Sequence, residues 1–233
     1  MQETIRRSIS GITYVVIMLI GIHFSPILLF TIIGLISLYE ILKLNTKSNQ
    51  NILVKYLFLI YMIFFFIVAI LPFTSSSILD QSTFNTKWRY TYLFIIIWVF
   101  DSFAYLIGKK FGHHKIFPSI SPKKSWEGFT GGYIFALITI IMITYSSELI
   151  NLRDNIYYII FLTFFICFYA TLGDFTASFI KRKFNLKDFG NFIPGHGGMI
   201  DRIDAFIIII PAINLLEYLN LYTEISFNLK TIL

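Results

Sequence analysis

The sequence has little charge and a single cysteine. Asp, Glu, Lys and Arg make up 14% of its 233 residues, whereas a soluble domain contains about 25%. Cys167 lies inside an apolar run and has no second cysteine with which to form a disulfide within the chain, so we expect it to be buried filler. Hydrophobic residues reach 56%, which is more than a soluble core can bury. We therefore predict an integral membrane protein.

The chain also lacks linkers rich in Pro, Gly or Ser, internal repeats, and the alternating segments of about ten residues that form membrane barrels. Its long apolar runs predict helices, because a helix satisfies its own backbone hydrogen bonds in lipid. A spanning helix needs about 20 mostly apolar residues. We predict an all-α fold with seven transmembrane helices near residues 9–24, 26–42, 53–72, 91–108, 128–146, 156–174 and 205–222. The first two are short and also compatible with one re-entrant hairpin.

Lys and Arg are unevenly distributed among the predicted loops. With the N-terminus in the cytoplasm, fifteen of the 19 basic residues lie in cytoplasmic segments, and the other four are Lys87, Arg89, Arg153 and Lys230. Cytoplasmic loops carry an excess of Lys and Arg, so we predict a cytoplasmic N-terminus. The net charge of +6 does not indicate a nucleic-acid partner, because the basic residues lie in short loops between apolar runs.

Glycine is scarce in the first part of the chain. Ten of the 13 glycines lie between Gly108 and Gly198, and glycine allows sharp turns and close approach of the backbone to a ligand. We therefore predict that residues 1–90 form a transmembrane scaffold. Residues 91–233 would form the catalytic transmembrane region of the same membrane-embedded unit.

Four carboxylates lie in or beside the predicted spans. Asp101 lies inside one span, Asp174 ends another, and Asp201 and Asp204 open the last at positions that share a helix face. A carboxylate within lipid costs about 2.5–3.5 kcal/mol and usually has a function. Carboxylates that converge at a water-accessible membrane edge suit Mg²⁺. Ordinary interfacial charge is the alternative, and for Asp101 a buried ion pair or a proton relay.

Two basic loops flank these carboxylates. The first, residues 108–128, contains Lys123, Lys124 and Ser125 near Pro and Gly turns. Lysine, serine and backbone amide groups in such turns can hold phosphate oxygens. A loop that contacts anionic lipid is the alternative.

The second loop, residues 178–204, is more strongly basic. It places Lys181, Arg182 and Lys187 before a glycine-rich turn that includes His196 and leads to Asp201. A flexible turn next to a helix N-terminus is a natural phosphate site. For His196 we favour a hydrogen bond to phosphate over proton transfer, because phosphoryl chemistry depends mainly on positioning and charge neutralisation.

The second loop resembles the signature of the phosphatidate cytidylyltransferase (CDP-diacylglycerol synthase) family. That signature combines Ser, Lys-Arg, Lys-Asp, a small residue, hydrophobe-Pro, His-Gly-Gly and Asp-Arg-hydrophobe-Asp at fixed spacing. This chain fills every position, with Ser178, Lys181, Arg182, Lys187, Asp188, Gly190, Ile193, Pro194, His196, Gly197, Gly198, Asp201, Arg202 and Asp204. Residues 121–128 and the pattern from Asp101 to Lys109 are also similar to the family. The resemblance covers residues 98–210.

The resemblance implies that CMP passes from CTP to phosphatidic acid, giving CDP-diacylglycerol and pyrophosphate. It implies one or two Mg²⁺ ions, a homodimer and, in bacteria, a plasma-membrane enzyme with its active site facing the cytoplasm. The catalytic residues would be Asp174, Lys181, Arg182, His196, Asp201 and Asp204, of which Asp174, Asp201 and Asp204 would hold the metal. The substrate-binding residues would be Lys123, Lys124, Ser125, Lys187, Gly197, Gly198 and Arg202.

Two other functions are compatible with parts of the sequence. A CTP-dependent lipid kinase of the polyprenol type would use an alcohol as acceptor, but the complete signature favours the cytidylyltransferase. A transporter would use Asp101 and Asp174 as an ion relay. Transporters often carry internal repeats and broken helices in both halves, whereas this chain concentrates its glycines and acids in one half.

Overall fold

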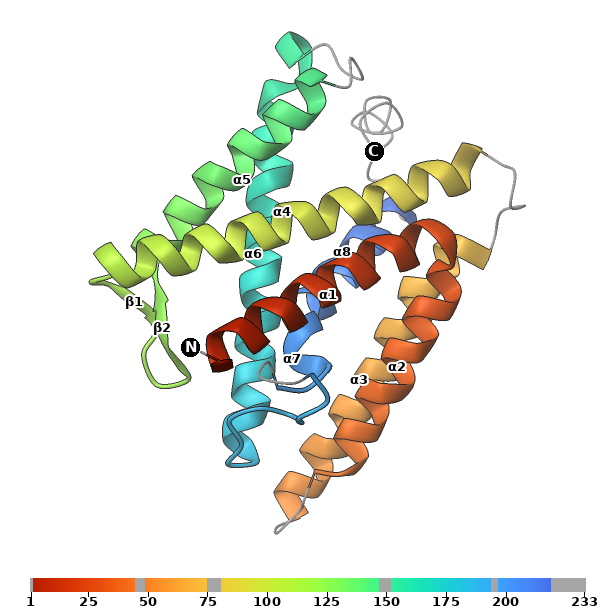
Figure 1. Cartoon of the computed structure of the whole chain (residues 1–233), viewed down its shortest axis with the longest axis vertical. Helices are drawn as coiled ribbons and strands as arrows, with labels where there is room; N and C mark the ends of the chain where they lie inside the picture. Colours follow the sequence, from red (N-terminus) through yellow and green to blue (C-terminus); the bar gives the residue numbers. More distant parts are fainter. Residues whose placement is uncertain (1, 45–48, 75–80, 147–151, 194–196, 219–233) are drawn as a thin grey trace.

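Helices and one small hairpin account for nearly all of the residues that the structure describes (Figure 1). A computed structural model describes residues 2–44, 49–74, 81–146, 152–193 and 197–218. The helices are α1 (Gln2–Phe24), α2 (Pro26–Leu42), α3 (Asn49–Thr74), α4 (Gln81–Phe111), α5 (Trp126–Ser146), α6 (Leu152–Lys183), α7 (Ile200–Ile203) and α8 (Phe206–Tyr218). Strands β1 (Lys115–Phe117) and β2 (Ser121–Ser125) pair antiparallel between α4 and α5. The predicted all-α class is confirmed, with this hairpin as a small addition.

Four of the helices are long and apolar enough to cross a membrane. The segments are Asn51–Phe73, Lys87–Phe111, Trp126–Thr144 and Ile159–Lys183. Shorter apolar helices at Ile9–Phe24, Pro26–Leu42 and Phe206–Leu215 coincide with the other three predicted spans. The chain is therefore an integral membrane protein, and the count of seven spans stays a prediction. Residues 219–222 of the last predicted span lie outside the described residues.

The apolar surfaces of these helices divide between a core and a lipid-facing exterior. Phe94 of α4 stacks on Phe206 of α8 at 4.0 Å between ring centroids, and both side chains are buried. Large side chains such as Ile60 and Phe161 remain exposed. Exposed apolar side chains on a spanning helix suit contact with acyl chains rather than water.

The helices form two groups that are joined by α8. In one group α2 packs against α3, and in the other α4 packs against α5, which packs against α6. Helix α8 contacts both α3 and α6. Helices α1 and α2 meet at Ser25 and diverge from there (Figure 1).

A glycine brings α6 and the α7–α8 segment into backbone contact. A Cβ on Gly173 would lie 2.4 Å from the backbone oxygen of Asp204, which real structures do not allow. The absence of a side chain here therefore permits the bend between α7 and α8 to lie against α6. This contact places Asp174, the next residue of α6, beside Asp204.

Candidate active site

An ion pair joins the β1–β2 hairpin to α6. Phe117 of β1 packs against Phe175 of α6 at 4.1 Å between ring centroids, which holds the hairpin over this part of the helix. Lys124 of β2 then contacts the Asp174 carboxylate through its Nζ atom. Both side chains are partly buried. The pair is fifty residues apart in sequence, and the first basic loop thereby reaches the first of the predicted catalytic acids.

Three carboxylates surround this lysine. Asp101 of α4 and Asp204 both interact electrostatically with Asp174 and with Lys124. Desolvation, together with the charge of Asp174, raises the pKa of Asp204 well above its usual range. Burial alone would lower the pKa of Lys124, but the neighbouring Asp174 carboxylate reverses this effect and raises it. Burial and the neighbouring Asp174 therefore make the ionised form of Asp204 costly, and a bound cation would stabilise that form.

A polar cavity lies beside the ion pair. It has a volume of about 270 Å³ and lies between α4, β2, α5 and α6. Its polar and charged lining consists of Asp101, Tyr105, Ser121, Lys123, Lys124, Ser125, Thr171 and Asp174. Because lysines and carboxylates face the same space, the cavity can hold a group that carries both phosphate oxygens and a cation.

Asp201 has a different set of partners from Asp204. Its Oδ1 atom lies 2.8 Å from Lys181 Nζ. Its Oδ2 atom accepts hydrogen bonds from the backbone N–H groups of Phe189 at 2.8 Å and Gly198 at 2.9 Å. The side chain is 3% exposed. Asp201 therefore ties the end of α6 to the signature loop and to the start of α7.

Glu40 of α2 holds the same loop from the opposite side. Its Oε1 atom accepts a hydrogen bond from the N–H group of Met199 at 2.8 Å, and its Oε2 atom accepts one from Ile200 at 3.1 Å. Gly198 makes this approach possible, because a Cβ there would lie 2.7 Å from either carboxylate oxygen. The sequence analysis missed Glu40, although it is the one acid in the apolar run 26–42. The criterion that singled out Asp101 would have identified it.

Arg202 lies between the two acids of the signature. Its backbone oxygen accepts a hydrogen bond from the Tyr14 hydroxyl at 3.0 Å, which ties α1 to this segment. Within the part of the chain that the structure describes, its Nε atom is buried and has no hydrogen-bond partner. A buried unpaired donor on a guanidinium group is suited to bind a substrate oxygen.

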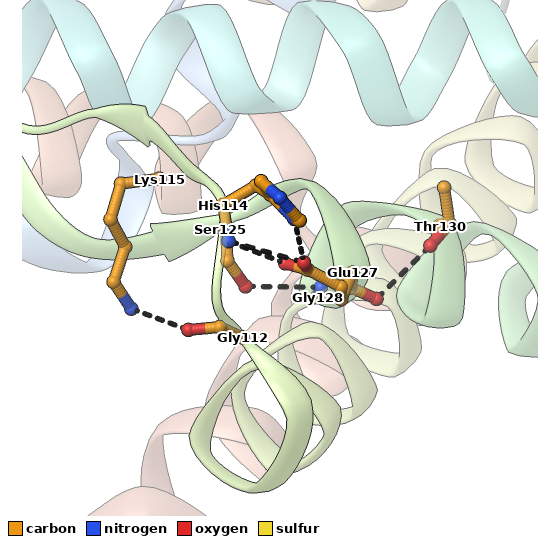
Figure 2. A network of polar contacts seen from close by, with 7 residues as sticks. All are labelled: Gly112, His114, Lys115, Ser125, Glu127, Gly128 and Thr130. Atoms are coloured by element: carbon orange, nitrogen blue, oxygen red, sulfur yellow. Dashed lines mark hydrogen bonds and ion pairs between the residues drawn. The ribbon is translucent and has the colours of Figure 1, made fainter.

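Ser125 has a local structural partner. It precedes α5, is 2% exposed, and its Oγ atom accepts a hydrogen bond from the N–H group of Gly128 at 3.2 Å, which is an N-cap geometry. Figure 2 shows this bond next to Glu127, whose Oε1 atom lies 2.6 Å from His114 Nδ1. Lys115 donates to Gly112 O at 3.0 Å in the same network. The bonds of Ser125 and Glu127 fix the base of the hairpin that carries Lys123 and Lys124, whereas the side chain of Lys115 is exposed.

The remaining predicted residues are spread over the signature loop. Arg182 and Lys187 have exposed side chains. Gly197 has a positive φ of 85°, a conformation that favours glycine, and its carbonyl accepts a hydrogen bond from Ile193 N at 2.9 Å. His196 lies outside the described residues.

The three acids that were predicted as metal ligands do not share one environment. Asp174 and Asp204 lie together near Lys124, whereas Asp201 is occupied by Lys181 and two backbone amides. Among the residues that the structure describes, no group of three or more His, Cys, Asp or Glu side chains could hold a metal ion by itself. Two carboxylates remain compatible with Mg²⁺, which commonly binds one or two carboxylates together with substrate phosphates.

Comparison with known proteins identifies relatives over most of the chain. The model described as "Cytidylyltransferase family" matches residues 46–219. A phosphatidate cytidylyltransferase of Bacillus subtilis (strain 168) is 35% identical over 196 residues, which cover 82% of this chain and 67% of that protein. Those of Staphylococcus haemolyticus (strain JCSC1435) and Staphylococcus aureus (strain COL) are 39% and 40% identical over 125 residues, or 54% of this chain. The match spans about half of each staphylococcal protein, 47% of its length.

Proposed function

The chain belongs to the cytidylyltransferase family, and on that premise we propose that it is a phosphatidate cytidylyltransferase. It would transfer CMP from CTP to phosphatidic acid and so produce CDP-diacylglycerol and pyrophosphate. The observation that carries this proposal is the contact of Lys124 with Asp174 beside Asp204. It brings the first basic loop to Asp174 at the edge of the cavity, and Asp174 in turn lies beside the signature acid Asp204.

Both substrates are anions, so the site must offset their mutual repulsion. Lys123 and Lys124 line the cavity, and we assign them to the phosphates of CTP. Lys181, Arg182 and Arg202 would bind a phosphate of either substrate. Fixed cations in a partly dehydrated site contribute several kcal/mol to stabilisation of a charged transition state.

The proposed reaction is a single displacement at phosphorus. A phosphate oxygen of phosphatidic acid forms a bond to the α-phosphorus of CTP. The bond from that phosphorus to the oxygen that bridges to the β-phosphate breaks, and pyrophosphate leaves with the bonding electron pair. In-line geometry is favoured when both reactants are held in place.

Asp174 and Asp204 are the acids that we assign to Mg²⁺. The ion, when bound, would neutralise charge on the phosphate oxygens. A metal role for Asp201 stays a prediction. Its three hydrogen-bonding partners argue against that role, because they already occupy both carboxylate oxygens. His196, Lys187, Gly197 and Gly198 likewise keep their predicted roles near substrate phosphates. The N-cap hydrogen bond of Ser125 supports a structural contribution beside its predicted substrate role.

We also propose the arrangement of the protein in the cell. The uneven distribution of Lys and Arg supports a cytoplasmic N-terminus and a cytoplasmic active site in a bacterial plasma membrane. The family resemblance supports a homodimer. The acyl chains of phosphatidic acid would remain in the bilayer while its phosphate enters the site.

Turnover of α-labelled CTP by the purified protein tests the proposal. In detergent with phosphatidic acid and Mg²⁺, the wild type should form labelled CDP-diacylglycerol. Asp174→Asn and Lys124→Ala should each lower kcat/KM by about 100-fold, because each removes a charge that faces the cavity. Lys115→Ala, on the same hairpin but with an exposed side chain bonded to Gly112, is the matched control and should remain active.

Three outcomes would contradict the proposal. If folded wild-type protein formed no labelled lipid, the proposed reaction would be wrong. A lipid phosphate together with CDP would identify a lipid kinase instead. Equal activity of Lys124→Ala and Lys115→Ala would remove Lys124 from the site.

A further inference from the structure

A large apolar groove lies between α1 and α2. It has a volume of about 770 Å³, within the range of about 300–1,000 Å³ that is typical of ligand pockets. The two helices meet at Ser25 and diverge, so they form two walls (Figure 1). Ile9, Thr13 and Ile17 line the first wall, and Leu29, Ile33 and Ile36 line the second. The groove therefore differs sharply in chemistry from the polar cavity beside Lys124.

The polar groups of the groove have partners within the protein. The Thr13 hydroxyl donates to the backbone oxygen of Ile9 at 2.9 Å, and the Tyr14 hydroxyl donates to the backbone oxygen of Arg202 at 3.0 Å. Neither hydroxyl hydrogen is therefore left for a polar ligand. A hydrocarbon is the class of occupant that loses no hydrogen bond in this space.

The groove is continuous with the signature loop. Phe192, Ile193 and Met199, which lie on both sides of the glycine-rich turn, complete its lining. The backbone of Met199 is held by Glu40, and the next residues lead to Asp201 and Asp204. One segment of chain thus separates the apolar groove from the acids of the site.

The groove is also open to the surroundings of the helices. Its rim residues Ile9, Ile17 and Ile32 are 60%, 54% and 48% exposed, and they lie on apolar helices. An occupant can therefore enter sideways from the bilayer without passing through water. Lipid tails are as apolar as leucine, so its retention would depend on close packing rather than on the hydrophobic effect.

We infer that the groove between α1 and α2 binds an acyl chain of the lipid substrate and so directs the phosphate of that lipid toward the signature loop. The inference rests on the proposed function and assigns a substrate-binding role to the N-terminal helices. The headgroup would lie beyond Met199, near Arg202 and Asp204. The polar cavity lined by Lys123 and Lys124 is then left for the nucleotide.

A matched pair of threonine substitutions tests the inference. Thr31 lies in a second apolar groove of about 370 Å³, whose lining residues all come from α2 and α3. Like Thr13, it is exposed and donates to a backbone oxygen four residues earlier, that of Ile27 at 2.7 Å. Thr13→Trp would fill the proposed acyl groove, whereas Thr31→Trp would fill a groove that no residue of the signature loop lines.

The measurement is kcat/KM for dioleoyl and for dihexanoyl phosphatidic acid, at saturating CTP. Thr13→Trp should lower the preference for the long-chain lipid by about tenfold, because added bulk in an apolar pocket discriminates by at least this factor. KM for CTP should not change. Thr31→Trp should keep the wild-type preference.

The possible failures are distinguishable. If the wild type makes no CDP-diacylglycerol, the proposed function fails and the inference fails with it. If the wild type is active and the two tryptophan variants have the same chain-length preference, the groove holds bulk bilayer lipid and the inference alone is overturned.

A labelling experiment on the wild type does not depend on folding of a variant. Phosphatidic acid with a photoactivatable group at the end of one acyl chain should label peptides containing residues 9–18 or 29–36. An excess of unlabelled phosphatidic acid should suppress this labelling, whereas phosphatidylcholine should not. Labelling confined to α3, α5 or α6, or a cross-link between α1 of two protein copies, would overturn the inference.

Discussion

At the scale of single residues, Asp201 and Asp204 show that equal side chains three positions apart can have unequal roles. Asp201 is paired with Lys181 and accepts hydrogen bonds from two backbone amides. Asp204 accepts one from the adjacent Ala205 N–H group at 3.0 Å and lies beside Asp174. The physical cause is that α7 ends at Ile203 and the chain bends before α8. Their spacing predicts that the two side chains share a helix face, but in the structure they have different partners.

Asparagine substitutions should separate these roles. Asp201→Asn should lower the free energy of unfolding by about 3–5 kcal/mol, because it leaves the Lys181 ammonium buried without its counter-charge. Asp204→Asn should leave stability unchanged or raise it, because it removes a carboxyl group that burial and the neighbouring Asp174 make costly to ionise, while kcat falls by about 100-fold. Thermal unfolding in detergent and CTP turnover measure the two effects. Equal loss of stability in both variants would contradict this assignment.

Glu40 acts on the site through backbone amides rather than through substrate. Glu40→Gln should cost about 1.5–3 kcal/mol of stability, because one carboxylate oxygen that accepts a hydrogen bond is replaced by an amide group that cannot. We expect kcat to fall while KM for CTP changes little, since Lys123 and Lys124 lie on a different element. Tyr39→Phe, an exposed change on the same helix, is the control. A rise in KM for CTP without loss of kcat would exclude the positioning role.

At the scale of elements, the site depends on how closely α6 approaches the α7–α8 bend. Gly173 permits backbone contact with Asp204, and the Phe117–Phe175 contact holds the hairpin against the adjacent turn of α6. Asp174 lies between these two contacts. Helix α6 is therefore the element that brings the two basic loops together.

Gly173→Ala should disrupt this arrangement. The new Cβ atom would lie 2.4 Å from Asp204 O, and backbone that must shift costs about 1–3 kcal/mol. Gly34→Ala in α2 is the matched control. Its Cβ would lie 3.2 Å from the Phe66 ring, and alanine favours a helix by about 1 kcal/mol over glycine.

Melting temperature and turnover should both fall for Gly173→Ala and remain close to wild type for Gly34→Ala. If Gly34→Ala lowered melting temperature and turnover more than Gly173→Ala did, the contact between α6 and the α7–α8 bend would not be important for the fold. A normal kcat for Gly173→Ala would show that the distance between Asp174 and Asp204 is not critical.

At the scale of the whole molecule, the described residues include seven apolar helices, and four of these reach spanning length. Helices α1 and α2 are joined by a turn at Ser25, which is exposed and lies at the end remote from the signature loop. Two spans would place this turn at the outer surface of the membrane. A re-entrant hairpin would leave it within the bilayer.

Cysteine labelling distinguishes these arrangements and tests the orientation. In a Cys167→Ser background, Ser25→Cys should react with a membrane-impermeant maleimide in intact cells. Lys115→Cys, on the exposed hairpin, should react only after the membrane is permeabilised. Failure of Ser25→Cys to react from outside would favour the re-entrant hairpin, and reaction of Lys115→Cys in intact cells would reverse the predicted orientation.

The sequence by itself determined the class of the protein, the approximate positions of its apolar helices and its family. Those properties follow from the lengths of apolar runs and from fixed spacing over short segments, both of which are read along the chain. The family is confirmed by comparison with known proteins. The acids at 174, 201 and 204 were also identifiable, because a charge beside an apolar span is costly wherever it lies.

The tertiary structure alone decided which of these residues meet. Lys124 contacts Asp174, which is 50 residues away in sequence. Glu40 accepts hydrogen bonds from the backbone of Met199 and Ile200, which are about 160 residues away. Such pairs depend on how helices pack, and no local pattern specifies that packing. The same packing placed Asp201 against the signature loop and Asp204 beside Asp174. It also formed the groove between α1 and α2, in the region that the sequence analysis predicted to be only a scaffold.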